Sequence, residues 1–292
     1  MKNVKWKIAP EHDDMLIKEF LQNQGFSRRI LKAVKFEGGR ISLNGKDVTV
    51  RQHLKTDDEL EVIFPPEQRG DRMEAEELDL DIVYEDEDVL VLNKRAGIAT
   101  IPSRNHPKGT IANGLLAHYE RKDLDYTVHI VTRLDKDTSG LLLVAKHRFS
   151  HSALSFAQKQ GKINRRYTAG IEGTLAMKCG TIDAPIGRKS DSLIEREVRA
   201  DGQYAVTHYQ VRKEFQDRTS VEVRLETGRT HQIRVHFAHL GHPLLGDTLY
   251  GGTTKYINRQ ALHCHSLEFN HPATKERMHF TAKAPEDFEG LL

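Results

Sequence analysis

The 292-residue chain lacks the features that mark secreted and membrane proteins. It has only two cysteines, Cys179 and Cys264, which excludes a framework of several disulfides. Nowhere do eighteen apolar residues follow one another, so we expect no membrane-spanning helix. The first residues, MKNVKWKIAPEHDD, lack the apolar core of a secretion signal. These absences predict a cytoplasmic protein, and its length allows one large and one small globular domain.

The net charge is close to zero, but the charges are unevenly distributed. The 44 Lys and Arg residues exceed the 42 Asp and Glu residues by two. Residues 28–46 hold six Lys or Arg and one acid, and residues 146–166 hold six and no acid, whereas residues 74–88 hold nine acids and no base. One basic segment is often only the solvated face of a helix. Two of them in a balanced chain favour a polyanionic partner such as nucleic acid.

Residues 12–64 have the pattern of a small α/β unit. Apolar residues in DDMLIKEFLQNQG recur at helical spacing up to Gly25, and Ser27 is placed to cap a second helix in SRRILKAVKFEGG. RISLNGKDV then indicates a strand with an Asn-Gly turn, and DELEVIF indicates another strand. The segment PPEQRGDR, residues 65–72, has the composition of a linker. We therefore predict a small domain over residues 1–72 and a larger one over residues 73–292.

The larger domain is rich in candidate strands. Helices are predicted at RFSHSALSFAQKQGK and at THQIRVHFAHLG. Strands in series with few helices between them are typical of an α+β fold with a largely antiparallel mixed sheet. The predicted strands are DIVYEDEDVLVLNK, HIVTRL, GLLLVAKH, RRYTAGIEG, THYQVRKEF, TSVEVRLET and MHFTAKAP.

The segment RLDKDTSG, residues 133–140, places charged residues between two apolar, strand-like runs. Burying an unpaired charge is costly, so these charges need partners or a chemical role. A calcium loop around Asp135 and Asp137 is one interpretation, although Lys146 stands where such a loop needs a bidentate Glu. A second is phosphoryl transfer through Asp135, which needs a further acidic pair downstream to hold magnesium, and the candidate segment LLGDTLYGG offers Asp247 alone. A third is one catalytic Asp, beside an Arg, that acts on a nucleic-acid base.

A family resemblance favours the third interpretation. RLDKDTSGLLLVAK resembles the His-Arg-Leu-Asp-x-x-Thr-Ser-Gly signature of the RluA-type RNA pseudouridine synthases. Three further segments resemble that family in the expected order, namely LVLNKRAGIATIP, INRRYTAGIEG and RLETGRTHQIRVHFAHLGHPLLGDTLYGG. The likeness extends from about Glu74 to the C-terminus. Two positions depart from the family pattern, where Thr132 replaces the usual His and Arg95 replaces the usual Pro.

The resemblance implies an isomerase that converts uridine in RNA to pseudouridine without a cofactor. It implies that Asp135 is the catalytic carboxylate, acting on the ribose, on the uracil or on a sugar proton. Arg234 is then expected to keep Asp135 ionised and oriented. Tyr167 is expected to stack on the uracil and to serve in removing the proton from C5. Arg133 is expected to hold the nucleotide that has left the helix.

The N-terminal unit resembles, more loosely, the S-four-like RNA-binding domain. FSRRILKAVKFEGGRISLNGKDV has the order of helix, turn and strand of that domain, although residues 37–40 replace its usual short glycine turn. RNA contacts are therefore expected from both domains. The expected residues are Arg28, Arg29 and Lys32 in the N-terminal unit, and Lys159, Lys162, Arg165, Arg166 and Arg229 in the larger domain.

The resemblance also favours a substrate and an assembly state. Large-subunit ribosomal RNA is expected, with transfer RNA as the alternative, and we expect a monomer. A non-catalytic RNA-binding protein and a metal-dependent phosphatase remain rival interpretations. Half of the sixteen histidines follow residue 230, and HCH at residues 263–265 looks like a metal site. Because no Cys-x-x-Cys pattern accompanies it, we predict no metal.

Overall fold

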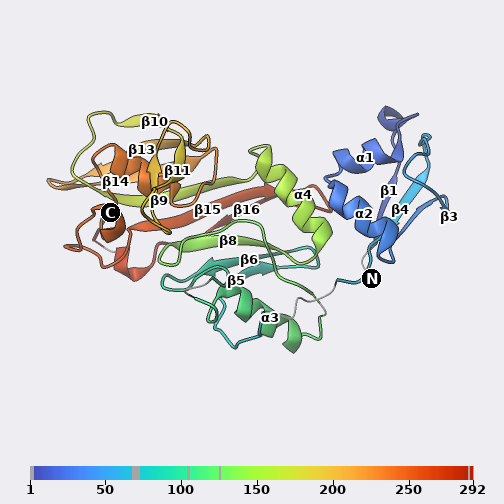
Figure 1. Cartoon of the computed structure of the whole chain (residues 1–292), viewed down its shortest axis with the longest axis horizontal. Coiled ribbons are helices and arrows are strands. Elements are labelled where there is room, and N and C mark those ends of the chain that lie inside the picture. The colour runs from blue at the N-terminus through green and yellow to red at the C-terminus, as the bar shows by residue number, and fades with distance from the viewer. Residues whose placement is uncertain (1–2, 68–72, 104–105, 125, 289, 292) are drawn as a thin grey trace.

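The computed structural model describes residues 3–67, 73–103, 106–124, 126–288 and 290–291. Figure 1 shows an elongated molecule with a small N-terminal unit at one end, next to helix α4 (Arg148–Lys159), and a large sheet in the remainder. Most of the predicted linker, and the boundary predicted at residue 72, lie outside the described residues. Among the described helices, none is long and apolar enough to cross a bilayer.

The N-terminal unit is a four-stranded antiparallel sheet with two helices. Its strand order is β1-β4-β2-β3. The predicted cap of the second helix is present, because the Ser27 hydroxyl accepts a hydrogen bond from the Ile30 amide at 3.3 Å. Asn44 and Gly45 both have positive φ, as the tight turn between β2 and β3 requires. The elements are β1 (Asn3–Lys7), α1 (Ile17–Asn23), α2 (Arg28–Phe36), β2 (Arg40–Leu43), β3 (Lys46–Asp47) and β4 (Glu59–Ile63), of which β1 was not predicted.

The N-terminal unit shares its core with helix α4. The Phe149 ring is 1% exposed and packs against Phe26, Phe64 and Trp6 of the N-terminal core. The Ser152 hydroxyl also donates a hydrogen bond of 2.6 Å to the Gly25 carbonyl. Apolar burial of a whole phenylalanine side chain contributes roughly 1.5–3 kcal/mol. The two units are therefore joined by packing as well as by the chain.

The larger unit is built on a ten-stranded sheet. Its main order is β10-β13-β14-β9-β15-β8-β6-β5, with β16 beside β15 and β7 beside β8. The pair β15–β8 is parallel and the other described pairs are antiparallel, which confirms the predicted α+β fold with a largely antiparallel mixed sheet. The strands are β5 (Ile82–Glu85), β6 (Val89–Lys94), β7 (His129–Ile130), β8 (Ser139–Ala145), β9 (Asn164–Glu172), β10 (Cys179–Asp183), β13 (Val206–Glu214), β14 (Arg218–Leu225), β15 (Leu262–Asn270) and β16 (Arg277–Thr281).

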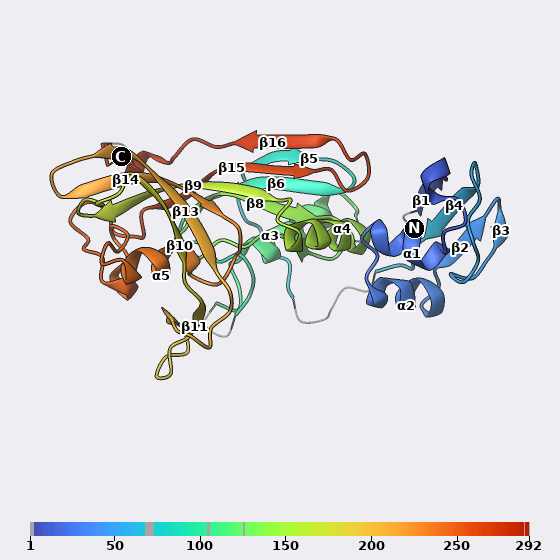
Figure 2. The same cartoon turned by 90° about the horizontal axis from the view of Figure 1, so that it is seen from above.

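The helices gather on one side of this sheet. Figure 2 shows α3 (Ile111–Arg121), α4 and α5 (Gln232–His239) on the same side, where the hairpin of β11 (Ile186–Arg188) and β12 (Arg196–Val198) also projects. Short 3-10 turns occupy Pro10–His12, Thr248–Tyr250 and Glu286–Phe288. Every residue of β8 is buried, so the core covers both faces of the sheet at this central strand.

The predicted strand HIVTRL is much shorter than expected. Only His129 and Ile130 pair with β8, and residues 131–138 form a loop. The Thr132 hydroxyl accepts a hydrogen bond of 3.0 Å from the amide of Leu143, which ties the chain to β8 where the strand ends. The expectation that Arg133 lies on this strand is therefore wrong, and the loop carries both Arg133 and Asp135.

Candidate active site

Asp135 lies on the loop between β7 and β8. Its carbonyl accepts a hydrogen bond from the Thr138 amide at 3.1 Å, which closes a tight turn after the carboxylate. On the other side of Asp135, the Thr100 hydroxyl donates to the Leu134 carbonyl at 2.7 Å. The backbone is thus held immediately before and after the acid.

Lys94, at the end of β6, also forms a hydrogen bond to the loop that carries Asp135. Its side chain is 1% exposed, and its ammonium donates hydrogen bonds of 2.8–2.9 Å to the carbonyls of Arg95, Ile98 and Lys136. Burial lowers the pKa of Lys94 to about 7. Lys94 therefore acts as a structural anchor for the loop, with all three donors used.

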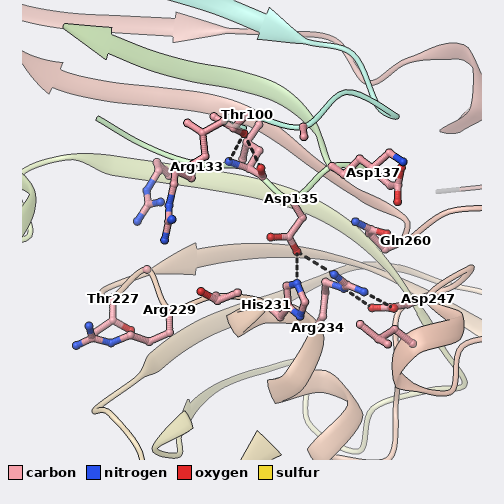
Figure 3. Close-up of a pocket in the computed structure, with 18 of the residues that line it drawn as sticks. Thr100, Arg133, Asp135, Asp137, Thr227, Arg229, His231, Arg234, Asp247 and Gln260 are labelled. Atoms are coloured by element: carbon pink, nitrogen blue, oxygen red, sulfur yellow. Dashed lines mark hydrogen bonds and ion pairs between the residues drawn. The ribbon is translucent and has the colours of Figure 1, made fainter. Parts of the chain in front are cut away.

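A buried arginine connects two carboxylates at the centre of the site (Figure 3). Arg234 on α5 donates from Nη1 to Asp135 Oδ2 at 3.0 Å, and from Nε and Nη2 to the two oxygens of Asp247 at 2.7 and 2.8 Å. Arg234 is 7% exposed and Asp247 is 2% exposed. Burial acts to lower the pKa of Arg234, but the hydrogen bonds to Asp247 and the charge of Asp135 outweigh it and raise the pKa. The predicted partnership of Arg234 with Asp135 is thus present in the geometry.

Tyr167, predicted as a site residue, lies near Asp135 and Arg234. It is on β9, 3% exposed, and lines a small cavity together with Asp135 and Arg234. Burial raises the pKa of the Tyr167 hydroxyl, so this group is protonated at neutral pH. The sheet therefore places an uncharged phenol in the same cavity as the Asp135–Arg234 pair.

Comparisons with known proteins agree on one family. The family model described as RNA pseudouridylate synthase matches residues 88–239. The RNA pseudouridine synthase YjbO of Bacillus subtilis is 55% identical over 95% of this chain and 98% of its own length. The chain belongs to the RNA pseudouridine synthase family.

Two further relatives extend the comparison. The ribosomal large subunit pseudouridine synthase D of Vibrio cholerae is 40% identical to this synthase over 90% of the chain and 85% of its own length. The solved structure of human RNA pseudouridylate synthase domain containing 1 is 25% identical, with a TM-score of 0.58 over 71% of this chain and 84% of the human one. The human structure shares the fold of the larger unit.

The site of this synthase also contains two residues that were not predicted. His231 Nδ1 lies 2.7 Å from the Tyr250 hydroxyl, which itself accepts a hydrogen bond from the Arg196 amide at 2.9 Å. His231 Nε2 lies 3.9 Å from Asp135 Oδ2, and burial lowers the pKa of His231. A neutral imidazole therefore faces the carboxylate.

The cavity around Asp135 is large and carries an excess of cations. Its volume is about 930 Å³. The predicted RNA contacts Arg133, Arg165 and Arg229 line it, as does Lys159 of α4. Its cations are Arg133, Lys136, Lys159, Arg165, Arg229, Arg234 and Arg259, and its acids are Asp135, Asp137, Glu226 and Asp247. This imbalance suits a polyanionic strand.

Arg166 is not brought to this cavity, although it was predicted together with Arg165. Successive residues of a strand point to opposite faces of the sheet. Arg165 is buried in the Asp135 cavity, whereas Arg166 is exposed and pairs with Glu222 at 3.2 Å in a hollow lined by Arg224 and His265. The alternation of side chains along β9 could have predicted that Arg165 and Arg166 lie on opposite faces of the sheet.

The predicted contacts of the N-terminal unit lie on one helix. Arg28, Arg29 and Lys32 are exposed on α2. Arg28 and Arg29 line a second cavity, between α2 and α4, whose lining shares Ser155 and Lys159 with the Asp135 cavity. The two cavities therefore meet along helix α4.

The two departures from the family pattern have structural contacts. Thr132 is 1% exposed and ties its backbone to β8, as described above. Arg95 is exposed, and its guanidinium pairs with Asp79 at 2.7 Å. Neither side chain lines the Asp135 cavity.

The HCH segment lies on β15, and its two buried members have other neighbours. His263 bonds to the Ser139 hydroxyl at 3.0 Å, and Cys264 is buried next to Gly140. Among the described residues, the group that has metal-ligand spacing is a different one, which consists of Asp86, Asp88 and His271. Its carboxylates already accept hydrogen bonds from Tyr84, His147, Ser150 and backbone amides.

Proposed function

We propose that this synthase isomerises uridine to pseudouridine in large-subunit ribosomal RNA. The observation that supports it most directly is Asp135, held by Arg234 at the floor of a cation-rich cavity. The relative from Vibrio cholerae that is named for the ribosomal large subunit matches nearly the whole chain, which favours ribosomal over transfer RNA. We further propose that the protein works as a monomer in the cytoplasm.

In the proposed reaction, the C1′–N1 bond of uridine breaks and a C1′–C5 bond forms, while the proton at C5 leaves and N1 gains one. The atoms balance without a cofactor. Asp135 Oδ2 is held by Arg234, and Oδ1 has no hydrogen bond among the residues that the structure describes. Oδ1 is thus the oxygen available to the nucleotide. Arg234 keeps the carboxylate ionised and correctly directed.

Tyr167 and the basic residues have separate proposed roles. The Tyr167 ring stacks on the uracil, and its hydroxyl takes up the proton that leaves C5 while its own proton passes to water. The target uridine must leave its helix to reach Asp135, and Arg133, exposed at the mouth of the cavity, holds it there. Arg165 and Arg229 contact the backbone within the same cavity.

The N-terminal unit, residues 1–72, is proposed to be the S-four-like RNA-binding domain, and residues 73–292 the catalytic domain. Its two helices and its Asn-Gly turn agree with that resemblance. Arg28, Arg29 and Lys32 on α2 would contact phosphates. The two cavities share lining residues on α4, which supports a single RNA strand that contacts both α2 and the catalytic cavity.

The test is a map of pseudouridines in total RNA from cells with and without the gene. We expect one or more sites in large-subunit ribosomal RNA to disappear without the gene. They should return with the intact gene and not with Asp135→Asn. Sites lost only from transfer RNA would contradict the proposed substrate, and an unchanged map would contradict the proposed activity.

A further inference from the structure

Two arginines in the cavity are equally buried but differ in their partners. Arg165 and Arg234 are each 7% exposed. Arg234 makes three hydrogen bonds to two carboxylates. The Arg165 guanidinium has no hydrogen bond or ion pair to any residue that the structure describes, and its Nε is fully enclosed.

An unpaired guanidinium in such a place is costly. Removing a cation from water without a counter-charge destabilises a fold by several kcal/mol. An anionic ligand would supply the missing partner. Arg165 lines both the large cavity and the smaller one that contains Asp135 and Tyr167, so such a ligand would lie beside the proposed catalytic carboxylate.

Gly228, next to Arg229, also indicates that the Arg165 guanidinium is accessible to a ligand. A Cβ at Gly228 would lie 2.9 Å from Nη2 of Arg165, closer than Cβ atoms normally approach. The backbone of Gly228 does not have the positive φ that would by itself favour glycine. The absence of a side chain there leaves the face of the Arg165 guanidinium open to the cavity.

We propose that Arg165 forms a phosphate-binding subsite for the linkage directly next to the target uridine, with Arg133 and Arg229 as further cations on its open side. This inference rests on the proposed function. A phosphate carries a full negative charge and matches the planar fork of a guanidinium, whereas the carbonyl oxygens of a neutral uracil would leave the charge of Arg165 uncompensated. The phosphates on either side of a ribose at Asp135 are the nearest anions that an RNA strand carries.

The subsite can be tested without turnover or knowledge of the RNA target. Binding of uridine, uridine 3′-monophosphate, uridine 5′-monophosphate and inorganic phosphate to the full chain is measured by NMR titration. We expect one of the two nucleotides to bind about tenfold or more tightly than uridine, as one charge-assisted hydrogen-bonded contact allows. Arg165→Gln should remove this advantage, and Arg165→Lys should keep part of it.

Arg166→Gln is the matched control, because it removes the neighbouring arginine on the opposite face of the same strand. It should bind the nucleotides as the wild type does. Equal binding of uridine and both nucleotides by the wild type, or the same loss in Arg166→Gln, would overturn the proposal. Inorganic phosphate bound as tightly as the nucleotides would contradict the place next to the uridine.

Thermal stability separates a binding role from a structural one. Because Arg165→Gln removes an unpaired buried charge, its melting temperature should equal or exceed that of the wild type. A clearly lower melting temperature would show that Arg165 supports the fold instead. If the pseudouridine map is unchanged but nucleotide binding depends on Arg165, the proposed function fails while the subsite stands.

Discussion

The cations of this synthase occupy two contrasting environments. In the Asp135 cavity, Arg165 and Arg234 are almost fully buried, whereas Arg28 and Lys32 on α2 are exposed to solvent. A buried charge costs several kcal/mol unless it is paired, and an exposed one costs little. The free energy of a buried cation therefore depends strongly on its partner group. The exposed cations attract any polyanion, and salt can screen this attraction. The comparison predicts that turnover depends on the buried cations, whereas the exposed cations of α2 add general RNA affinity.

The largest effect should come from Asp135→Asn. Asn is nearly isosteric and still offers an oxygen to Arg234, so the fold and RNA binding should survive. Loss of the carboxylate should reduce turnover by several orders of magnitude, at about 1.4 kcal/mol of barrier for each factor of ten. Release of tritium from uridine labelled at C5 measures this turnover.

Asp137→Asn is the control for that prediction. Asp137 lines the cavity but makes no contact with Arg234 among the described residues. Under the proposed function it should retain turnover, whereas a phosphatase mechanism would require both acids. An equal collapse in both folded variants would show that the catalytic carboxylate has been misassigned.

Tyr167→Phe should have the next largest effect. The ring remains available to stack on the uracil, but the buried hydroxyl is lost. General acid–base groups typically contribute about 10²–10⁴-fold, so turnover should fall within that range while RNA affinity is unchanged. Single-turnover kinetics at saturating RNA measures the step directly. Unaltered turnover would reduce Tyr167 to a stacking role.

Replacing Arg28, Arg29 and Lys32 together by Gln should weaken binding without changing turnover at saturating RNA. Three lost phosphate contacts should lower the slope of log affinity against log salt by about 2 for a single-stranded region. Filter binding over a series of salt concentrations measures this slope. This variant is preferable to deletion of the N-terminal unit, which would expose Phe149. Reduced turnover at saturation would break the separation between the two groups of cations.

The smallest effect concerns Glu67, which ties the end of the N-terminal unit to the larger one. Its carboxylate bonds to His129 and Thr127 and to the Arg148 amide. Burial acts to raise the pKa of Glu67, but the hydrogen bond and charge of His129 outweigh it and bring the pKa to about 2. Because the folded pKa lies below the ordinary value of 4.5, the contribution to stability is present above that pH and is lost as pH falls towards 2.

Glu67→Gln should therefore flatten this acid dependence. Thermal melting between roughly pH 5 and pH 2 should show a wild-type loss of stability that the variant lacks in part. His53→Gln, which changes an exposed histidine within the N-terminal unit, is a suitable control. The same pH dependence in wild type and Glu67→Gln would mean that Glu67 does not link the two units.

Local patterns in the sequence determined much of this protein. Helical spacing and the Ser27 cap predicted α1 and α2, and apolar runs predicted most strands, because such elements follow from period and capping alone. The order of four short motifs predicted the family and a site containing Asp135, Tyr167 and Arg234. Each of these residues stands at a fixed position within a motif, so the sequence alone identifies it.

Only the tertiary structure decided the partners of these residues. Asp247 looked like an isolated acid until folding placed it on Arg234, more than ten residues away along the chain. The sequence predicts Phe149 only as a member of the helix that became α4, whereas in the structure its side chain is part of the N-terminal core. In the sequence Arg165 and Arg166 form one basic pair. In the structure Arg165 lines the cavity, whereas Arg166 lies on the opposite face of the sheet. Composition and period set which side chains can be buried, but the energy of a buried charge depends on its neighbours in space, and those are known only once the strands have paired.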